Sequence, residues 1–164
     1  GCFMVEYGYE SGSQRMLDLM IKKVKREDYI KSAQVLYDLG IEMYASFMFA
    51  MPRETIDDLK QTISLMHEIK KVNPNTFLQN CIFLPLPATN MFKDAIELGY
   101  KPPNTLKEWS ERGIGSRFEE RNDITWMKKS VYNEYVKIYN EEFGEYKHAY
   151  EREKSGEYVN PMHE

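Results

Sequence analysis

Three mostly apolar runs set the pattern of this chain. They are Cys2–Tyr9, Ile41–Met51 and Phe77–Leu84, and their aromatic and branched side chains favour β-strands. The central run has only two polar side chains besides a tyrosine hydroxyl, Glu42 and Ser46. We therefore expect this run to be a strand buried on both faces of a parallel sheet.

Between and after these runs, apolar residues recur at helical spacing. This spacing predicts helices over about Gly12–Ile21, Glu27–Leu39, Thr55–Asn73 and Thr89–Gly99, with a long amphipathic segment over Ile124–Tyr139. Ser11 with Gln14, and Thr55 with Asp58, have the spacing of capping boxes. The long segment is expected to pack across the sheet or to cap the open side of a barrel.

Strands that alternate with helices through right-handed crossovers place all their carboxyl ends at one edge. Glu10 follows the first run and precedes a turn containing Ser11 and Gly12. A carboxylate there can accept hydrogen bonds from hydroxyls or an ammonium, and the helix start beside it can hold a carboxylate or phosphate. The alternative is an ordinary helix cap beside a solvated acid. The same edge is predicted to carry Glu10, Ser46, Pro52, Glu54, Pro85 and Thr89.

Composition narrows the class of protein. The length of 164 residues suits one domain, and the formal charge of −4 does not indicate a nucleic acid bound through its phosphates. No apolar run is long enough to span a bilayer, so no membrane partner is expected. Cys2 and Cys81 match neither a zinc nor a redox spacing, no metal site is expected, and a reducing cytoplasm is the simplest setting. The chain starts inside an apolar run without an initiator methionine, which suggests a piece of a longer protein.

Three segments resemble motifs of radical S-adenosylmethionine enzymes. Gly8–Arg15, Ser46–Thr55 and Pro85–Thr89 are similar, in order and spacing, to the motifs of the fourth, fifth and sixth strands of that family. The resemblance is greatest to the cobalamin-domain class that includes the anaerobic magnesium-protoporphyrin IX monomethyl ester cyclases. It implies an α/β fold in which residues 1–100 form the C-terminal, three-strand portion of a partial (β/α)6 TIM-like barrel. Residues 101–164 would form a helical C-terminal extension.

The resemblance also implies a cofactor site. In the family, S-adenosylmethionine lies across the carboxyl edge of the barrel against a [4Fe-4S] cluster. Glu10 and Ser11 would match the segment that meets the ribose or methionine part, Phe47–Glu54 the segment that flanks the adenine, and Leu84–Pro87 the contact on its other side. The expected cofactor-binding residues are Glu10, Ser11, Gly12, Ser46, Phe47, Ala50, Pro52, Glu54, Pro85 and Pro87. The resemblance identifies no catalytic residue.

The chain departs from the family pattern in two ways. The family has glycine where this chain has Ala45, Ala50, Arg53 and Ala88. Any of these positions that needs a positive φ would carry strain on the order of 1 kcal/mol. The family's three-cysteine cluster loop is also absent from this sequence, so the chain alone is not expected to be active.

These observations predict a fragment of a radical S-adenosylmethionine enzyme. The parent would be a cyclase-type oxidoreductase acting on a small-molecule substrate. The sequence does not decide whether the parent has a cobalamin domain. A radical methyltransferase or methylthiotransferase parent is one alternative, and a non-catalytic α/β module that binds a nucleotide or a partner is another. We also expect a homodimer, formed across the first strand or through the uncovered barrel interior, because one edge of that strand lacks a neighbour and because Phe47, Phe49 and Phe83 would otherwise meet water. The alternative is that the long C-terminal helix folds over that face.

Overall fold

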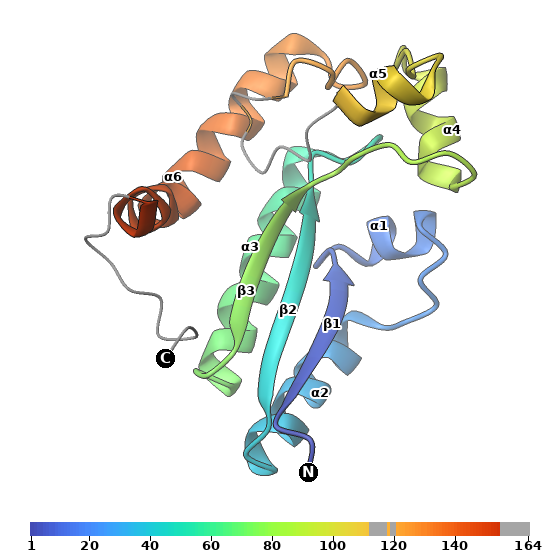
Figure 1. Ribbon diagram of the computed structural model, residues 1–164. Coiled ribbons are helices and arrows are strands. Elements are labelled where there is room, and N and C mark those ends of the chain that lie inside the picture. Colours follow the sequence, from blue (N-terminus) through green and yellow to red (C-terminus); the bar gives the residue numbers. More distant parts are fainter. Residues whose placement is uncertain (112–117, 119–120, 155–164) are drawn as a thin grey trace.

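The computed structural model describes residues 1–111, 118 and 121–154 of the chain. It shows an α/β fold with one three-stranded sheet (Figure 1). The strands are β1 (Met4–Glu10), β2 (Glu42–Phe49) and β3 (Phe77–Ile82), in the order β1-β2-β3, and both neighbouring pairs are parallel. The three predicted strands and their parallel arrangement are confirmed.

The strand ends differ from the predicted runs for local reasons. The second strand stops at Phe49 because Ala50 adopts a left-handed φ of 57°, outside the extended region of a regular strand. The first strand continues to Glu10, with a register shift against its neighbour between Gly8 and Glu10. All three strands still end at the same edge of the sheet, the carboxyl edge.

Helices connect the strands and extend beyond them. The described helices are α1 (Gln14–Leu19), α2 (Arg26–Asp38), α3 (Ile56–Val72), α4 (Asn90–Glu97), α5 (Leu106–Glu111) and α6 (Lys129–Lys154). The first of them ends before the predicted Ile21 because Ile21 takes a left-handed φ of 57°. The long amphipathic segment is confirmed as helical from Lys129 onward.

One of the two predicted capping boxes is present. The Thr55 hydroxyl accepts from the Asp58 amide at 3.3 Å, and the Asp58 carboxylate accepts from the Thr55 amide at 2.8 Å. The box predicted for Ser11 and Gln14 is wrong, because Ser13 is the N-cap residue of α1. The hydroxyl of Ser11 instead accepts from the Ser13 amide and pairs with Thr62 of α3, a tertiary contact that the spacing alone does not reveal.

The two faces of the sheet are unlike. On the helix face, which packs against α2 and α3, the second strand buries Met43, Ala45, Phe47 and Phe49 completely. On the opposite, open face, Glu42 is exposed and Tyr44, Ser46 and Met48 are only partly buried. The prediction of a strand buried on both faces is therefore wrong. Its aromatic and methionine side chains are apolar enough for a core but tolerate partial exposure.

Within the described residues, the C-terminal extension continues the helix layer and leaves Tyr44, Ser46 and Met48 on the open face partly exposed. The sixth helix lies beside α3, and its Tyr139 and Phe143 rings pack edge-on against Phe49 (Figure 1). Trp126 packs edge-on against Phe83, with ring centroids 6.0 Å apart. The expectation that Phe47, Phe49 and Phe83 would meet water is therefore wrong: their exposed fractions are 0%, 0% and 6%.

Candidate functional site

Left-handed backbone conformations cluster where the strands end. Glu10 has a φ of 66°, Ala50 of 57°, Arg53 of 64° and Ala88 of 69°, and none of the four is glycine. Such conformations cost about 1–2 kcal/mol each for a residue with a side chain, and they persist where the surrounding structure holds them. Three of the four positions at which the family has glycine therefore do require a positive φ. Ala45 does not, because it lies inside β2.

Glu10 lies on the open face at the end of β1. Its carboxylate forms an ion pair with Lys22 at 3.0 Å, and its side chain remains 21% exposed. The carboxylate bends back over Gly8, where an added Cβ would lie 2.4 Å from the Glu10 Oε1 atom. Gly8 thus leaves the space that the carboxylate occupies, and Glu10 presents its acid to the open face.

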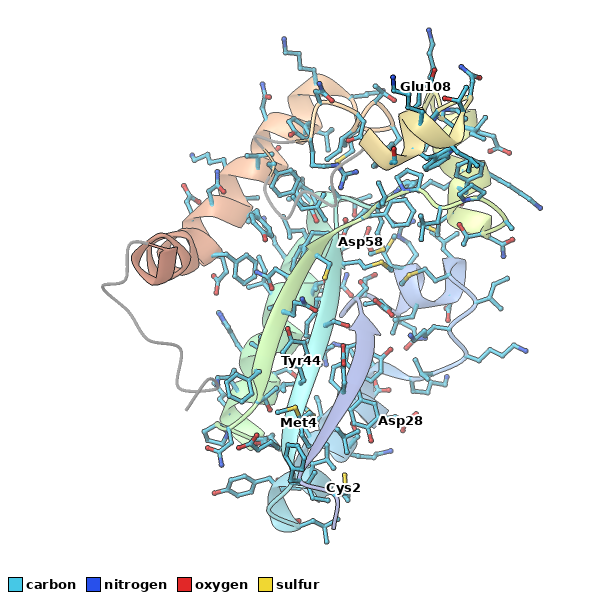
Figure 2. The ribbon with its side chains drawn as sticks, viewed as in Figure 1. Cys2, Met4, Asp28, Tyr44, Asp58 and Glu108 are labelled. Carbon is cyan, nitrogen blue, oxygen red and sulfur yellow. The ribbon has the colours of Figure 1, made fainter. Side chains whose placement is uncertain are left out.

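Polar groups from all three strands share the open face with Glu10. Ser46 donates a hydrogen bond to the Tyr7 carbonyl at 3.3 Å, and Tyr44 lies over the middle of the sheet (Figure 2). Partial burial raises the pKa of Tyr44, and the Glu6 carboxylate adds to the shift. Burial also raises the pKa of the Cys81 thiol, with further contributions from Glu10 and Glu6. This face therefore offers hydroxyls, carboxylates and a protonated thiol.

Ser11 and Gly12 are buried against α3. The Gly12 amide donates to the Thr62 hydroxyl at 3.0 Å, and the Ser11 hydroxyl lies 3.1 Å from the same atom. A Cβ on Gly12 would lie 2.4 Å from the Gln61 carbonyl oxygen and 2.6 Å from the Thr62 Cα. This glycine is required for close backbone packing, and its φ is not positive. Both residues fasten the turn after β1 to the helix that follows β2.

Asp58 joins the same turn to the start of α3, near the carboxyl ends of the strands (Figure 2). Its carboxylate accepts hydrogen bonds from Arg15, Ser13 and Thr55. Burial alone would raise the pKa of Asp58, but these hydrogen bonds outweigh it and lower the pKa to about 2. Asp58 is therefore a fixed anion that holds the first and second strand exits together.

Glu54 is a buried acid in the loop after β2. Its Oε2 atom accepts from the Met51 amide and from the Tyr135 hydroxyl, both at 2.9 Å. Its Oε1 atom has no hydrogen-bond partner among the described residues. Burial raises the pKa of Glu54 to about 8, despite the hydrogen bonds from Met51 and Tyr135 that favour its charged form. Glu54 is thus protonated at neutral pH and lies inside the protein, away from the accessible edge.

The C-terminal extension reaches the ends of β2 and β3 with three buried side chains. Trp126 donates to the Ala50 carbonyl at 2.8 Å, and the Tyr135 hydroxyl accepts from the Ala50 amide at 2.9 Å. Arg121 donates to the carbonyls of Ile82 and Phe83, at 3.3 Å and 2.8 Å. The sequence did not single out these three residues as part of a site: Tyr135 follows helical spacing like an ordinary core residue, and no local motif marks Arg121 or Trp126.

The expected cofactor-binding residues fall into two groups. Glu10 and Ser46 share the partly accessible open face, and Pro87 is exposed in the loop after β3. Phe47 points to the opposite face and is fully buried. The remaining expected residues are also buried. They could contact a ligand only with their main-chain groups or after a rearrangement: Ser11, Gly12, Ala50, Pro52, Glu54 and Pro85.

Comparison with known proteins gives partial relatives. No family model matches the chain. The chain is 32% identical over 88 residues to tRNA-2-methylthio-N(6)-dimethylallyladenosine synthase from Pelagibacter ubique, covering 52% of this chain and 19% of that protein. It is 29% identical over 96 residues to an uncharacterized methyltransferase from Pyrococcus horikoshii, covering 58% and 20%. An uncharacterized protein from Methanocaldococcus jannaschii is 25% identical over 114 residues, covering 69% and 26%.

These matches support the radical S-adenosylmethionine superfamily at a coarse level. The chain spans about a fifth of the length of the first two relatives. None of the three names mentions a cyclase, a porphyrin or cobalamin, so the finer resemblance to the cyclases has no support from them.

Two further observations concern membranes and metals. In the part of the chain that the structure describes, no helix combines the length and apolar character needed to cross a bilayer. Within the same residues, no three His, Cys, Asp or Glu side chains are placed to hold a metal ion. Cys2 is exposed just before β1, whereas Cys81 lies near the carboxyl end of β3. These two thiols do not fit an iron–sulfur cluster, which needs several thiolates in one place.

Proposed function

We propose that this chain forms the ribose and adenine side of an S-adenosylmethionine cleft in a radical S-adenosylmethionine enzyme. The observation that carries the proposal is Glu10, held in a left-handed conformation at the end of β1 with its carboxylate on the open face. In α/β proteins with parallel strands, small ligands bind at the carboxyl ends of the strands, where loops vary over a rigid sheet.

The open face suits the ribose part of the cofactor. Glu10 would accept hydrogen bonds from the ribose hydroxyls. Ser46 lies opposite Gly8 on the adjacent strand, and its hydroxyl already donates to the Tyr7 carbonyl. The adenine would rest along the main chain of Phe47–Glu54 on one side and of Leu84–Pro87 on the other. In such enzymes the bound cofactor supplies hydrogen-atom abstraction, and the cluster ligands would come from elsewhere in the parent.

Methyl or methylthio transfer is the better supported reaction class for the parent. Two relatives carry names of that kind, one a methylthio synthase acting on tRNA and the other a methyltransferase. A cyclase rests on the motif resemblance alone. We therefore propose a transfer reaction, with the substrate facing the same open side of the sheet.

The experiment is a calorimetric titration of the 164-residue chain with S-adenosylmethionine. We expect weak binding, and we expect Glu10→Gln to weaken it about 10-fold, because a hydrogen bond to a charged group contributes roughly 1.5–3 kcal/mol. Glu42→Gln is the matched control, since Glu42 lies on the same face at the opposite end of β2. Equal affinities for the wild type and Glu10→Gln would remove Glu10 from the site.

A further inference from the structure

Ala50 is held on both sides by the C-terminal extension. Its amide donates to the Tyr135 hydroxyl at 2.9 Å, and its carbonyl accepts from the Trp126 indole at 2.8 Å. These two groups flank the φ and ψ rotations of Ala50, whose φ is 57°. Fixing both groups fixes a backbone conformation that an alanine would otherwise leave.

The surroundings make these hydrogen bonds strong. Tyr135 is fully buried, and the exposed fractions of Trp126 and Glu54 are 5% and 4%. The Tyr135 hydroxyl also donates to Glu54, which accepts in turn from the Met51 amide. With little water to compete, each bond in such a chain is stronger than it would be at the surface.

The extension holds the end of β3 in the same way. Arg121 donates to the carbonyls of Ile82 and Phe83 and is oriented by an ion pair with Asp123 at 2.7 Å. The contacts at both strand ends are therefore made to main-chain atoms. These strand ends lead into the two segments that the proposed function places along the adenine.

We propose that Trp126 and Tyr135 are positioning residues. They hold Ala50 in its left-handed conformation and so set the course of the loop Ala50–Glu54 on the adenine side of the cofactor site. This inference rests on the proposed function for its ligand. The brace, meaning the two hydrogen bonds from Trp126 and Tyr135 to Ala50, offsets the steric cost of the alanine. Without it, Ala50 relaxes towards an extended conformation and the main chain of the loop turns away from the cofactor.

The first test removes each hydrogen bond while keeping an aromatic side chain: Tyr135→Phe retains the ring, and Trp126→Phe replaces the indole by a smaller one. Tyr135→Phe and Trp126→Phe are compared with Tyr37→Phe, a matched control that removes a tyrosine hydroxyl from the exposed side of α2. We expect S-adenosylmethionine to bind about 3- to 10-fold more weakly to the first two variants and unchanged to the control. Urea unfolding of each variant establishes that the titrated protein is folded.

The second readout does not depend on the ligand. In Tyr135→Phe the Ala50 amide loses the Tyr135 hydroxyl and keeps only its interaction with the Glu54 carboxyl group, so its hydrogen exchange, followed by NMR, should become about 3- to 10-fold faster. Exchange of amides in the middle of β2 should not change. Unchanged exchange at Ala50 would overturn the brace, even if affinity fell for another reason.

Rescue separates positioning from general loosening. Glycine adopts a φ of 57° without a steric cost, so Ala50→Gly in the Tyr135→Phe background should restore at least half of the lost affinity. If Ala50→Gly does not restore affinity, the brace does not act by holding Ala50 in its left-handed conformation.

Failure of the two proposals is distinguishable. If the wild type binds no S-adenosylmethionine, the proposed function fails, and the exchange of Ala50 still decides whether the extension holds the loop. If the wild type binds and Tyr135→Phe binds equally well, the positioning role is wrong while the proposed function stands.

Discussion

At the scale of single residues, Glu54 makes stability depend on pH. Its folded pKa of about 8 lies above that of an exposed glutamate, because burial disfavours the charged form. An acid with a raised pKa stabilises the fold fully below its unfolded pKa, and this contribution is lost as the pH rises through the folded value. We therefore expect the contribution of Glu54 to fall between about pH 4.5 and pH 8.

Glu54→Gln tests this dependence. The amide cannot ionise, so the variant should lose less stability than the wild type between pH 5 and pH 8, by at least about 1 kcal/mol. Urea unfolding at several pH values measures the difference. Glu42→Gln is the control, since it removes an exposed carboxylate at the start of β2 and should leave the profile between pH 5 and pH 8 as it is in the wild type. Parallel pH profiles for the wild type and Glu54→Gln would show that Glu54 is ionised in the folded protein.

The role of a residue could be predicted from the sequence where it depends only on its neighbours along the chain. The capping box of Thr55 and Asp58 needs only its own helix start, and the strain at Ala50, Arg53 and Ala88 followed from the glycines that the resemblance places there. Ser11 was misjudged because Thr62, distant in sequence, pairs with its hydroxyl. A spacing rule contains no such tertiary partner.

At the scale of elements, the contact between the turn after β1 and α3 allows no side chain at Gly12. Gly12→Ala would place its Cβ 2.4 Å from a backbone oxygen, and we expect a loss of about 1–3 kcal/mol in the free energy of unfolding. Gly8→Ala is the matched control, because the atoms nearest to its Cβ would belong to the movable side chains of Glu10 and Lys22 and not to the backbone. Equal losses for the two variants, measured by urea unfolding, would show that backbone packing at Gly12 is not the cause.

The order and type of the elements were predictable because apolar periodicity determines them. The open face was not, since the central strand contains Tyr44 and Met48, which suit either a core or a partly exposed face. The role of the extension was hidden for a similar reason. Tyr135 follows the same helical spacing as its core neighbours, and only the fold shows that its hydroxyl lies against Ala50.

At the scale of the whole molecule, the free edge of β1 remains the reason to expect a dimer. Within the described residues β1 pairs with β2 alone, and its other edge offers main-chain groups to a second copy. The phenylalanines give no second reason for a dimer, because they are buried in the single chain. We propose a two-fold dimer across β1 at micromolar concentration.

Sedimentation equilibrium tests the dimer. The Glu42 amide donates to the Phe3 carbonyl, so the main-chain groups of every second residue from Phe3 face β2 and those of Glu6 face the free edge. Glu6→Pro removes an amide from this edge and adds a ring that blocks pairing there, so it should shift the equilibrium towards monomer. Val35→Ala is the control, because it changes an exposed position on α2 away from this edge and should leave association unchanged. Val35→Pro is not a suitable control, because a proline there would break α2. A monomer at all concentrations would contradict the edge as an association site.

An NMR titration of the chain with S-adenosylmethionine, read at assigned backbone amides, decides whether the cofactor binds at the carboxyl edge of the sheet. We expect shifts at Glu10, Ser46, the loop Ala50–Glu54 and Leu86, with the amides of α2 unchanged. Shifts confined to the helix face, or none at millimolar cofactor, would contradict a cofactor site at the carboxyl edge of this sheet.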